Sequence, residues 1–270
     1  MTMSITVPTS ARPSRTTKTT VSPPWVVTSL ALFVVIWFVA SLIVGPALLP
    51  TPLTVAQTFI SLCVEPLAGL TLPGHVASSL TRWGTGFLIA VLVGVPVGIA
   101  FGAFTYVREA FTPVFEFLRY IPPFAWIPLA ILWMGAGQTS ASFIVFIAAV
   151  PPIIISTQVG IVNVDHRLPR AATNLGSGRA RTVTEILVPV AMPSIFTGIR
   201  VAVSNGWMAV VAAEMIGGTQ GVGFLIIQGQ ESGDVSVVIS GMIAIGATGA
   251  VIDWIVNILS RQVMPWRRSK

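Results

Sequence analysis

Residues 165–193 read DHRLPRAATNLGSGRARTVTEILVPVAMP, and long apolar segments flank this charged stretch on both sides. It contains four arginines: Arg167, Arg170, Arg179 and Arg181. A segment with this much charge is too costly to place in lipid, so it must project into water between two membrane spans. The pattern predicts a first short helix over Arg170–Leu175 that Gly176 ends, followed by a second helix that Ser177 caps.

The composition indicates an integral membrane protein. Of the 270 residues, 54% are hydrophobic and only 9% are charged, whereas a soluble domain has about a quarter charged residues. The formal net charge of +6 does not predict a nucleic-acid partner, because the basic residues cluster in loops that flank the apolar segments. We interpret these residues as topology determinants at the surface of a lipid bilayer.

Hydropathy predicts an all-α fold with six transmembrane helices. The predicted spans are about residues 25–44, 83–106, 117–134, 141–161, 194–216 and 235–259. A helix over Pro52–Val64 is too short to cross, since a crossing needs about 20 residues, so we place it outside the bilayer. Four charged residues between the second and third spans predict a short polar loop over 108–119.

The second predicted span contains glycines at four-residue spacing. Gly94, Gly98 and Gly102 form two consecutive GxxxG steps. Such steps allow two membrane helices to approach closely. Because glycine is common in membrane helices, we interpret the pattern as helix packing and not as a dimer face.

The chain divides into three predicted regions. Residues 1–24 are rich in Thr, Ser and Pro and are expected to form a disordered, basic cytoplasmic tail. Residues 25–260 form the transmembrane domain, and residues 261–270 form a second basic cytoplasmic tail. With both termini in the cytoplasm, 13 of the 15 Lys and Arg residues lie on the cytoplasmic side, which fits an even number of spans.

The spacing within the charged stretch resembles the "EAA" loop of the permease subunits of ABC importers. That loop reads Glu-Ala-Ala, three residues, Gly, nine residues, then Ile-x-Leu-Pro. The matching residues here are Arg170, Ala171, Ala172, Gly176, Ile186 and Pro189. Arg170 stands where the pattern has Glu, and Val188 stands where it has Leu, so a salt bridge made by that Glu is in doubt while the spacing is intact.

Two further segments resemble one branch of this family. RYIPPFAWIPLAILWMGAG over 119–137 and GIRVAVSNGWMAVVAAEMIGGTQGVGFLI over 198–226 are similar to the taurine, alkanesulfonate and nitrate permeases. The resemblance implies the importer permease fold, with residues 165–189 as a cytoplasmic coupling loop that docks on an ATPase. It also implies a multi-pass protein of the bacterial plasma (inner) membrane.

What the resemblance implies about function is specific. This chain would form the translocation path for a small anion, either sulfonate or taurine-like, or nitrate or bicarbonate. The expected partners are two copies of an ATP-binding cassette ATPase, an extracytoplasmic substrate-binding protein and a second copy of this permease. No cofactor is expected in this chain, because the partner ATPase uses the ATP and Mg²⁺.

Ionisable groups inside predicted spans are functional candidates, because they are costly in lipid. The candidate residues of the translocation path are Arg200, Asn205, Trp207, Glu214 and Trp126. Two roles fit Arg200, namely contact with an anionic substrate and snorkelling to the cytoplasmic interface. Glu214 fits either a gate or the outer interface, and Asp253 is expected to pair with Arg261. Trp126 fits a pathway wall or an interfacial belt.

Two other classes of protein are weaker alternatives. A secondary transporter or channel needs its own coupling groups in the spans and usually an inverted repeat, and neither is visible. A membrane enzyme needs a nucleophile with a base, or a cluster of metal ligands. Cys63 is the only cysteine, and His75 and His166 are interpreted as solvated or interfacial loop residues, so no catalytic or metal site is expected. The glycine-rich segment over 217–223 lacks the Gly-Lys-Ser/Thr ending of a phosphate-binding loop.

Overall fold

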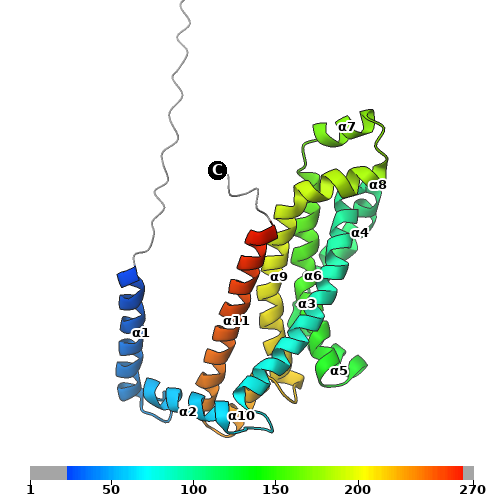
Figure 1. Ribbon diagram of the computed structural model, residues 1–270. Helices are drawn as coiled ribbons and strands as arrows, with labels where there is room; N and C mark the ends of the chain where they lie inside the picture. The colour runs from blue at the N-terminus through cyan, green and yellow to red at the C-terminus, as the bar shows by residue number, and fades with distance from the viewer. Residues whose placement is uncertain (1–22, 264–270) are drawn as a thin grey trace, which may run out of the picture. The chain divides into compact units, whose positions relative to one another are not determined.

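The structure of this protein is a computed structural model that describes residues 23–263, and its regular elements in that range are helices (Figure 1). In chain order they are α1 (Pro23–Val44), α2 (Pro52–Val64), α3 (Leu72–Ala103), α4 (Thr105–Arg119), η1 (Pro123–Trp126), α5 (Ile127–Met134), α6 (Gln138–Val162), α7 (Arg167–Asn174), α8 (Arg179–Thr182), η2 (Val183–Leu187), α9 (Val188–Gly217), α10 (Val222–Glu231) and α11 (Val235–Val263). The described part of the chain divides between Pro52 and Leu53 into two compact units. The tail predicted over 1–24 falls almost entirely outside the described range, as do residues 264–270.

The first unit contains α1, whose 22 residues include no charged side chain. Most of its large apolar side chains are exposed; for example, Leu30, Phe33 and Leu42 expose more than 60% of their surface. A helix that is apolar on every side and about 20 residues long is suited to span a bilayer. The first predicted span is therefore confirmed as a helix of the expected length.

Five helical segments are long and apolar enough to cross a membrane. They are Val27–Val44, Leu72–Ala103, Gln138–Val162, Arg179–Gly217 and Val235–Ser260. A sixth span exists if α4 and the following η1–α5 segment are counted together, although they are bent by 86° relative to each other. The all-α membrane class is confirmed, and the predicted third span over 117–134 is a broken helix.

The polar loop predicted over 108–119 is wrong, because these residues form most of α4. Arg108, Thr112, Glu116 and Arg119 recur at intervals of three or four residues, which places them on one face of a helix. The charges that suggested a loop are thus one face of an amphipathic helix. Two prolines follow at 122 and 123 and prevent α4 from continuing, because proline disfavours helical conformation in the residue before it.

The second unit is built around α6, which packs along both α3 and α9 and is the most buried of the candidate spans. Small side chains allow the close approach, and one core cluster consists of Ala90, Ala149, Ile153 and Ala202. At one end of this unit, α2 and α10 pack with α3 and α11 through a second apolar cluster that includes Leu62 and Leu225.

The glycines of α3 face α6, as the packing interpretation predicted. A Cβ atom added to Gly94 would lie 2.9 Å from Ile153 Cγ2, and one added to Gly98 would lie 2.6 Å from Thr157 Cβ. Gly102 is equally close to Ile161, with a 2.5 Å approach to its Cβ. The GxxxG steps therefore serve packing within the chain.

We expect Gly98→Ala to destabilise the protein by about 1–3 kcal/mol, because the added methyl group overpacks the contact with α6. Gly84 is the matched control, since it lies on the same helix and a Cβ there would meet nothing within 4 Å. Thermal unfolding of the two purified variants in detergent would compare them. Equal midpoints for Gly98→Ala and Gly84→Ala would contradict the packing role of this glycine.

Candidate functional site

The charged stretch forms a helix–turn–helix segment in which Gly176 has a positive φ of 81°. α7 ends in two capping hydrogen bonds: the Gly176 N–H donates to the Thr173 carbonyl at 3.0 Å and the Ser177 N–H donates to the Ala172 carbonyl at 2.9 Å. This pair of bonds is the Schellman ending, which requires a left-handed residue at the glycine position. The predicted helix stop at Gly176 therefore has a clear physical basis.

The second helix of the segment differs from the prediction in its cap and in its end. Gly178, not Ser177, is the N-cap residue of α8, and no side chain caps the helix there. α8 continues through the π-helical turn η2 into α9, so that Arg179–Gly217 is one long helical stretch. A π turn accommodates a local break in the pattern of backbone hydrogen bonds. Pro189 causes such a break, because it has no N–H to donate.

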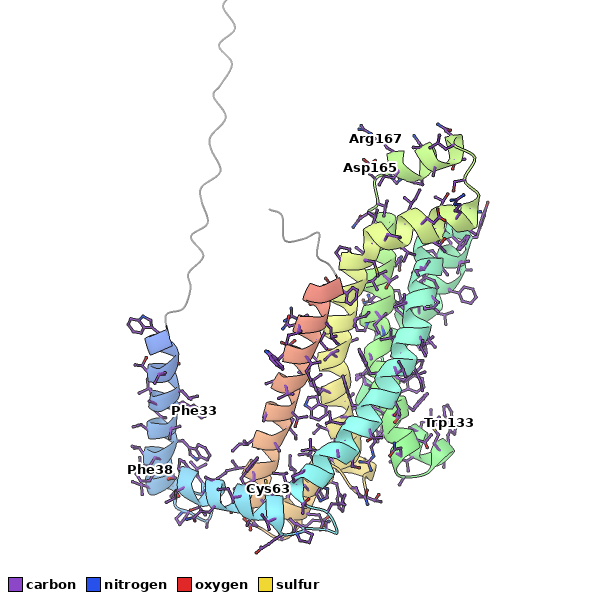
Figure 2. All side chains as sticks on the ribbon, in the orientation of Figure 1. Phe33, Phe38, Cys63, Trp133, Asp165 and Arg167 are labelled. Carbon is purple, nitrogen blue, oxygen red and sulfur yellow. The ribbon has the colours of Figure 1, made fainter. Side chains whose placement is uncertain are left out.

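The residues of the predicted coupling motif lie along this segment. Arg170, Ala171 and Pro189 are exposed, Ile186 is half-buried, and Ala172 is buried with 8% of its surface exposed. α7 also presents Leu168 and Leu175 to solvent, with 44% and 88% exposed. Figure 2 shows Asp165 and Arg167 at the start of α7, at the end of the second unit away from α10. The first helix of the segment is thus free to contact another protein.

A cation–π contact joins the charged segment to the corner between α3 and α4. The Arg179 guanidinium lies over the Phe104 ring at 4.8 Å from its centroid. Phe104 is the residue between α3 and α4. Cation–π contacts at exposed sites contribute about 0.5–1 kcal/mol of stabilisation.

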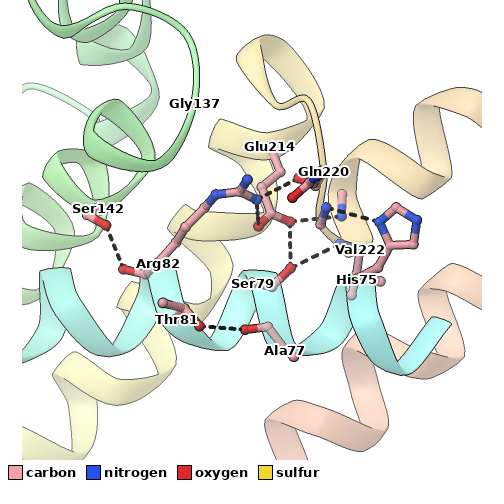
Figure 3. A network of polar contacts seen from close by, with 12 residues as sticks. His75, Ala77, Ser79, Thr81, Arg82, Gly137, Ser142, Glu214, Gln220 and Val222 are labelled. Carbon is pink, nitrogen blue, oxygen red and sulfur yellow. Dashed lines mark hydrogen bonds and ion pairs between the residues drawn. The ribbon is translucent and has the colours of Figure 1, made fainter. Parts of the chain in front are cut away.

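A buried polar network occupies the opposite end of α9 (Figure 3). The Glu214 carboxylate accepts hydrogen bonds from Arg82 Nη1 at 2.9 Å, from Ser79 Oγ at 2.8 Å and from the Gly223 N–H at 3.1 Å. Arg82 exposes 4% of its side chain and Glu214 exposes none. The two charges are therefore paired and almost completely enclosed by protein.

The same network holds the loop between α9 and α10 against α3. Arg82 Nη1 also donates to the Gln220 carbonyl at 2.5 Å, and Ser79 Oγ accepts from the Val222 N–H at 3.0 Å. Gly221 has a φ of 112°, and a Cβ there would overlap the Glu214 carboxylate. The glycine-rich segment that could be mistaken for a phosphate loop is therefore closely packed around a carboxylate.

His75 belongs to this network, and its interpretation as a solvated or interfacial loop residue is wrong. It lies in α3 with none of its surface exposed. Its Nδ1 accepts from the Gly221 N–H at 3.1 Å, and its Nε2 lies 2.9 Å from the Leu67 carbonyl. These two contacts require the neutral tautomer with the proton on Nε2, which donates to Leu67.

Two of the other predicted path residues lie at contacts between α9 and α11. Arg200 Nε is 3.4 Å from the Asp253 carboxylate, and both side chains are about half exposed. Asp253 thus pairs with Arg200, whereas the side chain of Arg261, its predicted partner, lies outside the described set. Trp207 is buried and donates through Nε1 to the Ile245 carbonyl at 3.2 Å.

Trp126 and Asn205, which lie far apart in the sequence, line one cavity of about 370 Å³. Residues of α4, of η1, of the break between them, of α6 and of α9 form its walls. Arg119 is the charged residue in this lining, and sequence reasoning had placed it in the polar loop. Pro151 and Asn205 lie near the middle of α6 and α9, so the cavity lies about halfway along these two helices.

The comparisons with known proteins agree on one family. Residues 86–265 match the family model described as "Binding-protein-dependent transport system inner membrane component". The chain is 35% identical to the taurine transport system permease protein TauC of Escherichia coli (strain K12) over 241 residues, 88% of each chain. It is 34% identical to the nitrate import permease protein NrtB of Synechococcus elongatus over 279 residues, 99% of this chain and all of the relative.

A further relative and a solved structure extend this result. The bicarbonate transport system permease protein CmpB of Synechococcus elongatus is 37% identical over 188 residues, 69% of this chain and 68% of that protein. A chain of the MetNI methionine ABC transporter in an inward-facing conformation superposes with a TM-score of 0.61. It is 17% identical and covers 70% of this chain and 94% of that chain, which supports the fold alone.

We expect Glu214→Ala to lower the free energy of unfolding by about 3–5 kcal/mol, because it leaves the Arg82 guanidinium buried without its partner. Asp253→Ala is the matched control, since it removes a carboxylate from a half-exposed pair and should change stability by at most about 1 kcal/mol. Thermal unfolding in detergent measures both. A Glu214→Ala variant as stable as Asp253→Ala would show that the network does not hold α9 to α3.

Proposed function

This chain belongs to the family of binding-protein-dependent transport system inner membrane components, and on that premise we propose that it forms the translocation path for a small anion in an ATP-driven importer. It is a multi-pass inner membrane protein and the non-catalytic permease component of its system. Family membership favours this function over the secondary transporter or channel that the sequence left as an alternative.

The observation that carries the mechanism is the geometry of the charged segment. α7 is an exposed helix that ends in a fixed left-handed turn, and the chain after that turn continues without a break into the span α9. A force applied to this segment therefore reaches the membrane domain through a covalently continuous helix. This arrangement supports docking on a separate ATPase. In the proposed complex the ATPase is present in two copies and uses ATP and Mg²⁺, and this chain needs no cofactor.

The relatives support the choice of cargo. Their names give taurine, nitrate and bicarbonate, of which the last two are small oxyanions and taurine contains a sulfonate group. The cavity that contains Trp126 and Asn205 has Arg119 as its charged lining residue, which is the sign of charge that an anion requires. An extracytoplasmic binding protein would deliver the anion to the end of the second unit opposite α7.

A homodimer is the simplest assembly for this subunit. The chain carries one segment that we propose for coupling, residues 165–189 (the coupling segment), so two copies related by a two-fold axis would present two such segments to two ATPases. The path would then lie on that axis, between the copies. The mass of the purified complex in detergent would test this assembly, and a single permease chain per complex would exclude it.

We expect Gly176→Val to weaken docking of the ATPase on this chain and so to reduce transport. The variant would force a β-branched side chain into a backbone conformation with φ 81°, at a cost of about 1–2 kcal/mol, and so would change the direction of α7. Because nothing lies within 4 Å of a Cβ at this position, the effect would come from the turn and not from a clash. Co-purification of the ATPase and substrate-stimulated hydrolysis should both fall sharply, while the amount in the membrane stays near normal.

Gly178→Val is the matched control, because Gly178 has an ordinary φ of −69° and a Cβ there also meets nothing within 4 Å. This variant should couple normally. If Gly176→Val transported at the normal rate and retained its ATPase, the segment would be an ordinary basic loop.

Cysteine labelling would test the orientation, with both termini and the coupling segment in the cytoplasm. In a background without Cys63, a cysteine at Gln138 or Gln220 should react with an impermeant reagent from outside. Both residues are exposed, and they lie at the start of α6 and in the loop before α10. A cysteine at Ser177 should react only from inside, so external labelling there would reverse the topology.

A further inference from the structure

The cavity between the α4–α5 bend, α6 and α9 contains three polar groups among mostly apolar walls. Arg119 carries a charge, Asn205 carries an amide, and Trp126 carries an indole N–H. Apolar walls with a few convergent polar groups are typical of sites for small molecules, and the volume of about 370 Å³ lies within the usual range. The lining includes no acidic residue in the part of the chain that the structure describes.

The Arg119 guanidinium is held in place yet keeps donors available. Its Nε donates to Glu116 at 2.6 Å, and its Nη2 has a long contact of 3.4 Å with the Tyr120 hydroxyl. The guanidinium also lies over the Tyr120 ring at 4.8 Å from the centroid. Nη1 has no partner among the described residues, and the contact of Nη2 is weak. Glu116 is not part of the cavity lining, so the acid positions the arginine without occupying the cavity.

The exposure of this ion pair indicates what it faces. Arg119 and Glu116 expose 31% and 40% of their side chains within a pair of helices, bent by 86°, that forms either a broken span or a re-entrant segment. Ion pairs on a surface that faces lipid are too costly to persist, and charged residues in spans face the bundle interior or a water-filled cavity. The α4 face that carries Arg119 therefore lines an aqueous path or an interface between subunits.

The broken helix beside Arg119 supports the same conclusion. Tyr120–Pro122 separate α4 from η1, and Ile121 in this break lines the cavity. Irregular backbone inside a membrane is tolerated only where protein or water satisfies its polar groups. Binding sites of membrane transporters are built repeatedly at such breaks.

An indole donor at the cavity wall has no acceptor among the residues that the structure describes. Trp126 Nε1 is buried and makes no hydrogen bond. A buried donor without an acceptor is unfavourable, so this position favours an occupant with a hydrogen-bond acceptor. Because the atom has almost no exposed surface, an acceptor reaches it only after a small shift of the cavity wall.

We propose that this cavity is an intramembrane binding site for a small oxyanion, with Arg119 as the residue that recognises its charge and Asn205 and Trp126 as neutral donors. The planar guanidinium offers parallel N–H donors to two oxygens of a sulfonate, nitrate or bicarbonate, which the compact ammonium of lysine does not match. The site rests on the proposed importer function and adds a named selectivity residue to it. Arg200, the arginine favoured by the sequence, does not line this cavity.

The test uses the complete importer, purified with its ATPase and binding protein and reconstituted in liposomes. ATP-dependent uptake of taurine, nitrate and bicarbonate is measured for the wild type and for Arg119→Gln, Arg119→Lys and Arg108→Gln. Arg108 is the matched control, because it lies on α4 and loses the same charge but does not line the cavity. A double variant, Arg119→Gln with Glu116→Gln, separates recognition of the anion from the effect of an unpaired Glu116.

We expect Arg119→Gln to reduce uptake of the transported anion at least about tenfold, which corresponds to about 1.4 kcal/mol. Arg119→Lys should be intermediate, Arg108→Gln should stay within about twofold of the wild type, and all variants should retain the ATPase. The double variant should remain defective. Recovery of uptake in the double variant would reduce Arg119 to a structural partner of Glu116 and overturn the proposal.

Failure of the site and failure of the proposed function give different results. If the wild type imports one of the three anions and Arg119→Gln imports it equally well, the site is wrong and the importer function stands. A different result would rule out both the anion cargo and the site. In that case the wild-type complex hydrolyses ATP but imports none of the three anions, and the wild-type and Arg119→Gln complexes import an uncharged solute equally well.

Discussion

A charge enclosed within a membrane domain needs a partner inside the protein, and this constraint shapes the end of the bundle where α9 meets α10. Arg82 and Glu214 lie 132 positions apart in the sequence and meet at 2.9 Å with almost no exposed surface. Removing both charges from water is costly, and the pair is maintained because Ser79 and a backbone N–H supply further hydrogen bonds to the carboxylate. The packing of α3 against α9 and the path of the following loop both depend on this pairing.

The same constraint has a different solution near the middle of the bundle. Arg119 and Glu116 also form an ion pair, but the pair is local, partly exposed and adjacent to a broken helix and a cavity. An enclosed pair fixes structure, since the Glu214 carboxylate and Arg82 Nη1 find their partners within the chain. A partly exposed pair leaves N–H donors available to a bound anion. This contrast explains why we interpret the two arginines differently although both are charges in a membrane domain.

Local signals in the sequence predicted the parts of the molecule that local chemistry determines. Gly176 was predicted as a helix stop because a left-handed turn favours glycine, and its φ of 81° agrees. The long apolar spans were predicted by hydropathy. The amphipathic α4 was missed because charges were interpreted as a loop, although their spacing of three and four residues was a readable helical signal. The pairing of Arg82 with Glu214 could not be predicted, because the separation of 132 residues leaves no local pattern.

The two ends of α9 are held by different partners, and the cavity lies between them. At one end the helix continues through η2 into the coupling segment, and at the other end Glu214 fixes it to α3. Asn205 lies between these ends and contributes to the cavity. A displacement of the coupling segment therefore has a covalent route to the cavity along α9. The contact of Arg179 with Phe104 gives it a second route into α4, the helix that carries Arg119. Both routes meet at the walls of one cavity, so the segment that we propose to contact the ATPase and the proposed anion site are connected through two separate helices.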